Sequence, residues 1–560
     1  MPYKKIYAQR IKDNKYKINL WTDEGGHEVL NWVNKAYIEC PEKDATHTGL
    51  NGEPLRKTTE WSAQDDRGLH FHDMPPHQKF LIEKYGLNDE PSKTHKEVFF
   101  DIEIEMGEAL TEEYIKRAPK KVLSIAYYYR QEDTWGIFFL DEENKLKNTK
   151  AKNKEIISCE NEQELLFRFL ERFREIDPDI LVGFNSDFFD IPYLYYRISK
   201  ILGVDVASYL SPIGIVRETP WYSEQYIQIA GVESLDYLRL HKKFSWADEP
   251  SYKLGDIGEK YVKIKKIEYE GNLSKLYSED VHKFIRYNFR DVEILKALDE
   301  KLEYLALVKN LSHKGKHNYS EVFANTKTQD GAISAYLLNE NIIPPSKDKN
   351  SITKKNYAGG YLFCPYAGVY KYLFDEDLVS LYPSIIITLN IGKETFVCRI
   401  IDSDDRNRRL GLNDLKKRDP NDEILIENNK RKQTRVKISQ LINFIEDQKW
   451  TISANGVCFR TDRESVLATV LKKWFDERAY YNKEKKKAYK SGEEELGAKF
   501  HMKQYTFKIL LNSLYGALAL SGGFRYGNVI LAEATTLSGQ RIINESALEA
   551  NKFMNDMMKK

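Results

Sequence analysis

The stretch YLFDEDLVSLYPSIIIT, residues 372–388, indicates both a local fold and a chemistry. It predicts a short apolar strand, then acidic residues, a turn at Pro383 and an apolar helix from Ser384. Asp377 ends the strand, where a carboxylate oxygen suits a hard divalent cation. The backbone N–H groups of residues 378–382 can face an anion at the helix start. A cation ligand beside a phosphate cradle is what nucleotidyl transfer requires, and a plain strand, turn and core helix is the alternative.

The string DLVSLYPSI, which begins at Asp377, resembles the first polymerase signature of family B DNA polymerases. The resemblance implies that Asp377 is catalytic and binds metal, with Mg²⁺ or Mn²⁺ in two-metal sites and dNTPs as substrates. It also implies a nucleotide-binding role for the residues around the turn: Leu378, Ser380, Leu381 and Tyr382. Asp375 departs from the uncharged residue that is usual in phage relatives, so its role stays open.

Length and composition limit the other possibilities. The chain has 560 residues, of which 41% are hydrophobic and 31% charged, and is long enough for about three or four globular domains. Its net charge of +1 neither indicates nor excludes nucleic-acid binding, although basic runs occur at 428–437 and 483–490. The five cysteines form no CxxC pair, which argues against a zinc site or disulfide framework and fits a reducing compartment. We see no signal sequence and no run of about 18 apolar residues, so we expect no membrane segment.

Predicted strands and helices alternate over residues 98–304, which indicates an α/β domain. One of its helices opens at Asn161, a favourable capping residue. Tyr287 lies one helical turn before an aspartate and shares its face, so it could orient a water molecule. Two acids share one face of the strand VFFDIEIE, and two more fall on helices. Together they can hold two Mg²⁺ or Mn²⁺ ions for phosphodiester hydrolysis. These candidate metal ligands are Asp101, Glu103, Asp190 and Asp291.

Three segments of this α/β domain resemble, in order and spacing, the signatures of the family B 3′–5′ proofreading exonuclease. They are FDIEIE, GFNSDFFDIPY and YNFRD. The intervening segments SPIGIVRE and GVESLDYLRLHKKF are similar to sequences of the T-even-type bacteriophage polymerases in particular. The resemblance implies an RNase H-like fold, the four acids as catalytic metal ligands and Tyr287 as a further catalytic residue.

Residues 462–520 predict a helical hairpin. An apolar stripe runs from Val466 to Phe475, and the break SGEEELG separates this helix from the next. The second helix places three polar or aromatic residues on one face, and an ordinary hairpin with solvated lysines is the alternative. These residues are Lys508, Asn512 and Tyr515.

The segment KILLNSLYG resembles the second polymerase signature of family B. The resemblance implies that Lys508 and Arg478 bind the triphosphate, Asn512 supports the site and Tyr515 packs against the nascent base pair. Relatives usually carry a lysine four residues after this arginine, where this chain has Asn482. The resemblance therefore does not imply a second triphosphate contact from this helix.

The predicted fold class is multidomain α/β and α+β. We expect a β-rich N-terminal domain at 1–97 with a return segment at 305–356, the exonuclease domain at 98–304, a first palm part at 357–461, helical-hairpin fingers at 462–520 and a truncated second palm part at 521–560. Residues 401–460 resemble no signature and are assigned to the palm. YAGG resembles a family motif that touches template, with a plain turn as the alternative. Its implied DNA-binding residues are Tyr357, Gly359 and Gly360.

The third polymerase signature, YxDTDS, is missing, since the sequence contains no DTD, and the family's thumb is missing too. We therefore expect the large subunit of a split polymerase, completed by a second chain that also recruits a sliding clamp. The implied partners are primer–template and single-stranded DNA, and the implied location is the host cytoplasm of a virus-encoded enzyme. The alternatives are a stand-alone 3′–5′ exonuclease whose polymerase half only binds DNA, a non-catalytic nucleic-acid-binding protein, a truncation or a frameshift. The four intact acids argue against the non-catalytic protein.

Overall fold

The computed structural model describes residues 2–62, 68–105, 107, 109–220, 226–245, 248–324, 326–348, 359–361, 368–369, 377–401, 410–429 and 431–558. The chain divides into two compact units. Unit 1 comprises Met1–Asn34, Pro75–Leu81 and Asn88–Ala324; unit 2 comprises Lys35–Met74, Ile82–Leu87 and Asn325–Lys560. This division cuts across the predicted N-terminal domain at 1–97, and helix α1 (Pro76–Tyr85) contributes to both units.

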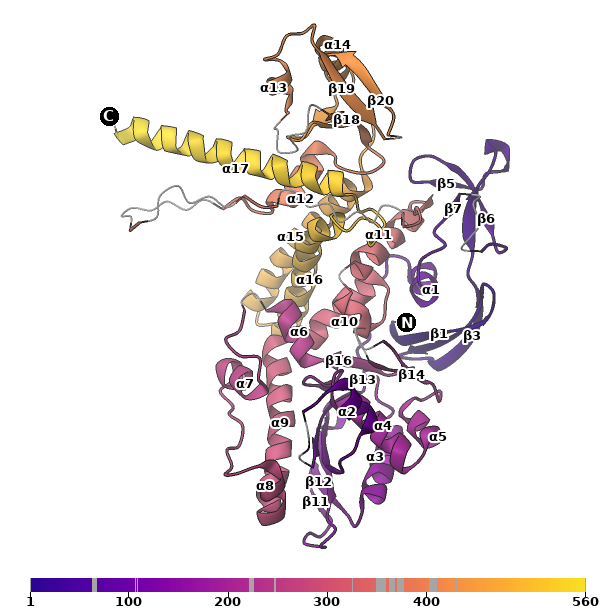
Figure 1. Cartoon of the computed structure of the whole chain (residues 1–560), viewed down its shortest axis with the longest axis vertical. Helices are drawn as coiled ribbons and strands as arrows, with labels where there is room; N and C mark the ends of the chain where they lie inside the picture. The colour runs from indigo at the N-terminus through magenta and orange to yellow at the C-terminus, as the bar shows by residue number, and fades with distance from the viewer. Residues whose placement is uncertain are drawn as a thin grey trace. The chain divides into compact units, whose positions relative to one another are not determined.

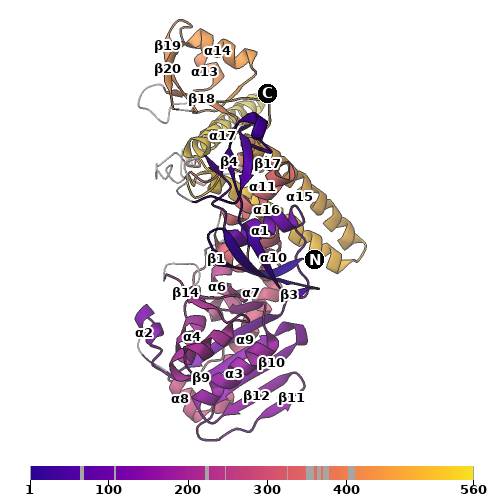
Figure 2. The ribbon, with the colours of Figure 1, turned by 90° about the vertical axis from the view of Figure 1, so that its right-hand side faces the viewer.

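Unit 1 is built around a mixed seven-stranded sheet of order β11-β12-β10-β9-β8-β13-β16. Helix α9 lies on one side of this sheet and α3 on the other, as Figures 1 and 2 show. The strand β9 is buried along its whole length because helices cover both faces. The strands are β8 (Glu97–Ile104), β9 (Val122–Tyr129), β10 (Thr134–Leu140), β11 (Thr149–Ala151), β12 (Lys154–Cys159), β13 (Ile180–Gly183) and β16 (Glu233–Asp236).

Several helices of unit 1 begin at a residue whose side chain accepts a hydrogen bond from the first turn. The Asn161 side chain accepts a hydrogen bond from the Glu164 N–H at 2.9 Å and opens α3, as predicted. The helices are α2 (Glu112–Arg117), α3 (Glu162–Ile176), α4 (Asp190–Ile201), α5 (Val204–Ala207), α6 (Tyr237–Phe244), α7 (Leu254–Val262), α8 (Leu273–Glu279), α9 (Val281–Leu302) and α10 (Tyr304–Gly315).

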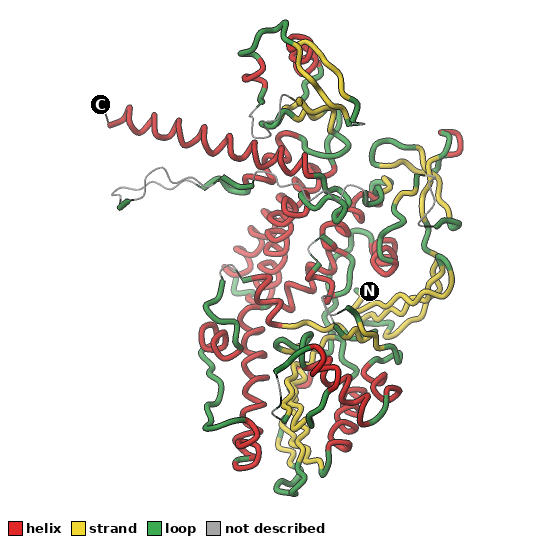
Figure 3. Tube along the Cα trace, in the orientation of Figure 1, coloured by secondary structure: helices red, strands yellow, loops and turns green. Residues whose placement is uncertain are grey.

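The first strands of the chain form a separate antiparallel sheet of unit 1, shown with the other strands in yellow in Figure 3. Its strands are β1 (Tyr3–Lys12), β2 (Lys15–Thr22) and β3 (Gly26–Val33), and a short hairpin pairs β14 (Val216–Glu218) with β15 (Ile227–Ile229). The Tyr3 hydroxyl donates to the carbonyls of Ser312 and His317, at 3.0 and 2.8 Å. The beginning of the chain is therefore fixed to residues more than 300 positions later.

Unit 2 contains a five-stranded sheet of order β17-β5-β6-β4-β7. The strand β17 pairs with β5 in parallel, so residues after 325 return to the segment around 35–74. One core joins both segments through Tyr37, Leu55, Phe71, Ala335 and Ile343. The elements are β4 (Ala36–Glu39), β5 (His47–Gly49), β6 (Pro54–Thr58), β7 (Leu69–His70), β17 (Ile342–Ile343) and α11 (Lys327–Asn339).

The predicted helical hairpin is present in unit 2 as α15 (Val466–Lys490) and α16 (Glu494–Leu518). The Ser465 side chain caps α15, and its apolar stripe is buried except for the half-buried Phe475. The break is shorter than predicted: it ends at Glu493 instead of Gly497. Acidic side chains in the first turn of a helix interact favourably with its dipole, so EEL starts α16 rather than interrupting it.

A second five-stranded sheet of unit 2, of order β20-β19-β18-β22-β21, has its strands between residues 396 and 459. It includes most of the segment 401–460, which matches no signature and is predicted to belong to the palm. The core of this sheet consists of residues between 396 and 459 alone, and α14 covers it. Cys398 and Cys458, distant in sequence, are register partners here and are both free thiols. The basic run 428–437 falls on the exposed β19–β20 hairpin. The elements are β18 (Phe396–Ile401), α13 (Leu412–Leu415), β19 (Glu423–Asn428), β20 (Gln433–Lys437), α14 (Ile438–Asp447), β21 (Thr451–Ile452) and β22 (Val457–Phe459).

Unit 2 also contains helices α12 (Leu381–Leu389) and α17 (Val529–Met558). The predicted helix start at Ser384 is three residues too late, since α12 begins at Leu381. Proline is tolerated in a first helical turn because N–H groups there need no partner within the helix, so Pro383 lies inside the helix. Within the ranges that the structure describes, no helix is both long and apolar enough to cross a bilayer.

A buried arginine holds distant parts of unit 2 together. The Arg525 side chain is fully buried, and its guanidinium donates to Asp73 at 2.6 Å and to Asp330 at 3.0 Å. Removing one partner of a buried ion pair costs about 3–5 kcal/mol, because the other partner is left buried and uncompensated. We therefore expect Arg525→Met to lower the unfolding free energy of unit 2 by about this amount in urea titrations.

Arg460→Met is the matched control for Arg525→Met, because Arg460 pairs with Asp462 at the surface. Exposed pairs contribute about 0–1 kcal/mol, so this variant should unfold almost like the parent chain. Equal urea midpoints for the two variants would contradict the structural role of Arg525.

Candidate functional site

Three acids of unit 1 converge between strand β8 and helix α9. Asp101 and Glu103 come from β8, whose two-residue period places both on the face toward α9, and Asp291 comes from α9. One carboxylate oxygen of each lies within 4.8 Å of one of each of the others. Hard oxygen ligands at this separation suit Mg²⁺ or Mn²⁺.

The fourth predicted acid, Asp190, lies beside this carboxylate cluster. It is the first residue of α4 and is 4% exposed. Its Oδ1 accepts a hydrogen bond from the N–H of Ile102, between Asp101 and Glu103, at 3.2 Å. Burial raises the pKa of Asp190 to about 7, and repulsion from Asp236 and Asp291 adds to the rise. The structure thus brings three of the predicted acids into one cluster and places the fourth against the strand that carries two of them.

The carboxylate cluster is electrostatically unfavourable without a cation. Burial, with repulsion from Asp291, Glu103 and Asp190, raises the pKa of Asp101 well above its ordinary range. Burial and Asp291 raise the pKa of Glu103 to about 8. The Oδ1 of Asp291 is buried without a hydrogen-bond partner among the described residues. An orphaned oxygen among repelling carboxylates fits a divalent cation, which would relieve both penalties.

A lysine that the sequence analysis missed lies against the carboxylate cluster. The Lys266 Nζ is 2.5 Å from Asp291 Oδ2 and 5.3 Å from the ring centroid of Tyr287. The Tyr287 ring also meets Tyr269 edge-on, with centroids 5.3 Å apart. Burial raises the pKa of Tyr287, so its hydroxyl stays a neutral hydrogen-bond donor. Lys266 follows α7 in a lysine-rich loop, and nothing in that composition distinguishes it from solvated neighbours.

Asn288 is a second missed residue. Its Nδ2 donates to Asp101 Oδ2 at 2.7 Å, while its Oδ1 accepts from the Ser124 hydroxyl at 2.7 Å. It lies three residues before Asp291 on the buried face of α9. A polar residue at an apolar position of a helix is the signal that could have identified it.

The predicted nucleotide-binding residues lie on separate helices of unit 2. The Tyr382 ring of α12 stacks on the Tyr515 ring of α16, with centroids 4.4 Å apart. Asp377 is exposed four residues before the start of α12. Ser380 occupies the N-cap position of that helix with a φ of 56° and makes no side-chain capping hydrogen bond there. The first-turn N–H groups of α12 belong to Leu381, Tyr382 and the residues that follow them, and Leu378 lies three residues before Leu381. Asp375 and Tyr357 lie outside the described residues.

The glycines of the YAGG motif lie near the same tyrosine. Gly359 accepts a hydrogen bond from Gln540 Nε2 at 2.7 Å, and a Cβ on Gly360 would lie 3.3 Å from the Tyr382 hydroxyl. The structure therefore brings the YAGG glycines, Tyr382 and Tyr515 together.

The predicted triphosphate-binding residues lie on the two helices of the hairpin, Arg478 on α15 and Lys508 and Asn512 on α16. Lys508 and Arg478 are half-buried and Asn512 is exposed. The Arg478 Nε is buried without a hydrogen-bond partner among the described residues. Helix α12, which follows Asp377, packs against both helices of the hairpin.

Comparison with family models and with known proteins identifies the family of this chain. Residues 325–560 match the model of DNA polymerase family B, and residues 80–257 match that of the DNA polymerase family B exonuclease domain. The chain is 26% identical to the DNA-directed DNA polymerase of Escherichia phage RB69, over 96% of the chain and 65% of that protein. It is 29% identical to the DNA-directed DNA polymerase of Enterobacteria phage T4, over 71% and 46% respectively. The chain thus spans less than two thirds of these relatives. Since both family models together cover most of its length, the chain belongs to DNA polymerase family B.

Proposed function

We propose that this chain is a DNA-directed DNA polymerase chain whose unit 1 removes nucleotides from the 3′ end of DNA. The observation that supports the exonuclease is the cluster of Asp101, Glu103 and Asp291, of which Asp101 and Glu103 lie inside the segment 80–257 matched by the exonuclease model. The proposed substrates are single-stranded and primer–template DNA, and the phage relatives favour the cytoplasm of a bacterial host.

The three clustered acids, with Asp190 beside them, would hold one or two Mg²⁺ or Mn²⁺ ions. When bound, such ions supply the positive charge that stabilises a phosphodiester transition state and the acidity that makes water a nucleophile. The chain's own groups prepare this site. Asn288 fixes the orientation of Asp101, and the Tyr287 hydroxyl can hydrogen-bond the attacking water. Lys266 offsets part of the negative charge at Asp291.

Polymerisation requires, we propose, a second chain that carries YxDTDS and the thumb and recruits a sliding clamp. Two-metal nucleotidyl transfer needs more than one carboxylate, and the matched signatures supply only Asp377. The incoming dNTP would contact the first turn of α12 and the hairpin residues Arg478, Lys508 and Asn512, with Tyr515 against the nascent base pair. The alternative is a stand-alone exonuclease. It would not extend a primer even when a partner chain with YxDTDS and the thumb is added.

The exonuclease is tested directly with the purified chain. We expect a 5′-labelled single strand to shorten stepwise from its 3′ end in Mg²⁺ or Mn²⁺, and to stay intact in EDTA, because the site needs the cation. Circular single-stranded DNA is the matched control and should not be cut. Cleavage of the circle would show an endonuclease instead, and an intact linear strand in Mn²⁺ would reject the proposal.

A further inference from the structure

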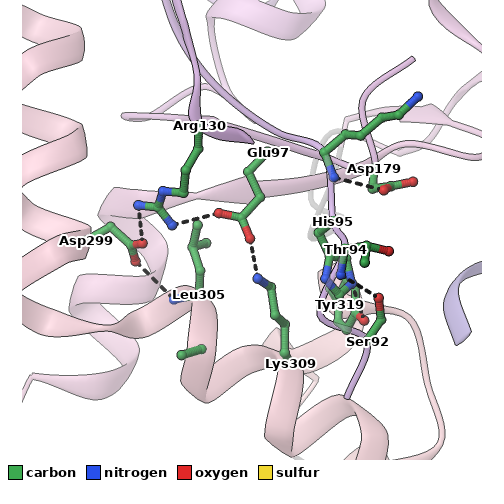
Figure 4. Close-up of polar contacts among 12 residues, drawn as sticks. Ser92, Thr94, His95, Glu97, Arg130, Asp179, Asp299, Leu305, Lys309 and Tyr319 are labelled. Carbon is green, nitrogen blue, oxygen red and sulfur yellow. Dashed lines mark hydrogen bonds and ion pairs between the residues drawn. The ribbon is translucent and has the colours of Figure 1, made fainter. Parts of the chain in front are cut away.

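A network of ion pairs surrounds Glu97 at the start of β8 (Figure 4). Glu97 and Asp299 are 3% and 4% exposed at their side chains. The Arg130 guanidinium joins them, with NH1 at 2.6 Å from Glu97 Oε2 and NH2 at 2.8 Å from Asp299 Oδ2. Lys309 of α10 donates to the other oxygen of Glu97.

Arg130 joins the same two elements that form the carboxylate cluster. Glu97 lies on β8, four residues before Asp101 and therefore on the same strand face. Asp299 lies on α9, eight residues after Asp291 and on the same buried face. Strand β8 and helix α9 thus meet twice: at the acids that would bind metal, and at Arg130.

The spacing of the two meeting points agrees along both elements. Four residues of strand span about 13 Å at 3.3 Å per residue. Eight residues of helix span about 12 Å at 1.5 Å per residue. The strand and the helix therefore run antiparallel, and the distance between the two meeting points is nearly the same along each of them. The Arg130 guanidinium also lies 4.6 Å from the ring centroid of Phe99, which occupies the strand face between Glu97 and Asp101.

We propose that Arg130 is a positioning residue for the carboxylate cluster, because it holds α9 against β8 at the separation that lets Asp291 share a cation with Asp101 and Glu103. The proposal rests on the exonuclease function proposed above. Carboxylate oxygens of the three acids lie within 4.8 Å of one another, so like charges on β8 and α9 oppose the approach of the two elements until a cation binds. A planar guanidinium that donates to one carboxylate on each element counters this repulsion without touching substrate or metal.

Lys309 provides a matched control, because it belongs to the same network and its ammonium pairs with Glu97 of β8, whereas Arg130 pairs with an acid on each of β8 and α9. Lys309 attaches Glu97 to α10 and leaves the Arg130 link between β8 and α9 in place. Lys309→Met and Arg130→Met thus each remove one cation from Glu97, but only Arg130→Met removes the link between strand and helix.

The test measures Mn²⁺ affinity of the full chain by electron paramagnetic resonance, alongside the Mn²⁺ concentration that half-activates hydrolysis. Partners that touch a metal ligand directly contribute about 10- to 100-fold to affinity, and Arg130 acts through two backbones, so we expect about tenfold weaker binding in Arg130→Met. Lys309→Met should keep the parental affinity even if its melting temperature falls. Arg130→Lys, which keeps the charge but loses the fork, should recover part of the affinity.

The Mn²⁺ affinities of these variants test whether Arg130 positions the carboxylate cluster. Parental Mn²⁺ affinity in Arg130→Met, or equal losses in Arg130→Met and Lys309→Met, would overturn the positioning role. If Arg130→Met does not fold, Asp299→Asn weakens the same link while keeping an acceptor for the Leu305 N–H, and should weaken Mn²⁺ binding in its place. A parent chain that binds Mn²⁺ without cleaving DNA would reject the exonuclease and leave this test intact. A parent chain that binds no more Mn²⁺ than Asp101→Ala would reject both.

Discussion

Replacing Asp101 and Glu103 together by alanine should lower the rate of 3′-end hydrolysis by about 10³-fold or more. Metal ions supply several kcal/mol of transition-state stabilisation, and each 1.36 kcal/mol corresponds to tenfold in rate. Both acids belong to the cluster whose oxygens lie within 4.8 Å of one another, so the double variant removes two of its three carboxylates. The measurement is single-turnover digestion of a 5′-labelled single strand in Mg²⁺ and in Mn²⁺.

This loss should occur without loss of stability. Burial and mutual repulsion raise the pKa values of both acids, so removing them relieves an unfavourable interaction in the metal-free fold. We therefore expect the metal-free double variant to melt no lower than the parent chain. Glu142→Ala plus Glu143→Ala, two adjacent exposed acids of unit 1, is the matched control and should keep full activity. Unchanged hydrolysis in the Asp101 and Glu103 variant would refute the metal assignment.

The second large effect concerns polymerisation. In an exonuclease-inactive background, the 560-residue chain alone should extend a primer hardly at all, since one carboxylate cannot hold the pair of ions that nucleotidyl transfer uses. Adding a candidate partner chain with YxDTDS and the thumb, encoded in the same genome, should restore dNTP-dependent extension. Asp377→Ala should then remove it by about 10³-fold, as expected for loss of a metal ligand.

Asp447→Ala is the control for Asp377→Ala, because Asp447 is an exposed acid at the end of α14 in the same unit. It should leave extension in the two-chain mixture unchanged. Robust extension by the large chain without any partner would show that the site is complete in one chain and would exclude the split arrangement.

The sequence predicted those features that depend on short periodic patterns. The two-residue period of a strand placed Asp101 and Glu103 on one face, and the stripe from Val466 predicted the first hairpin helix. Asn161 marked the start of α3 because capping is a local interaction. The family signatures located Asp291 and Asp190, although only the structure shows that Asp190 binds the backbone of Ile102.

Features that depend on contacts between distant residues were not predictable in this way. Lys266 approaches Asp291 from a loop whose sequence differs little from a solvated run of lysines. The sheet at residues 396–459 gains its core from short strands with few apolar positions each, so no single window shows it. The link that Arg130 makes between Glu97 and Asp299 requires three residues that lie 33 and 169 positions apart.

The buried Arg525 also determines when unit 2 can finish folding during synthesis. Its partner Asp73 lies 452 residues earlier in the chain. At about 5–20 residues per second, a ribosome needs roughly 20–90 s to make the intervening chain. During that interval the carboxylate of Asp73, in the early segment of unit 2, lacks the arginine that later pairs with it. Non-local contacts of this kind slow folding and leave apolar surface exposed to aggregation. Chaperones that bind nascent chains should therefore engage residues 35–74 of this protein longer than any part of the exonuclease sheet.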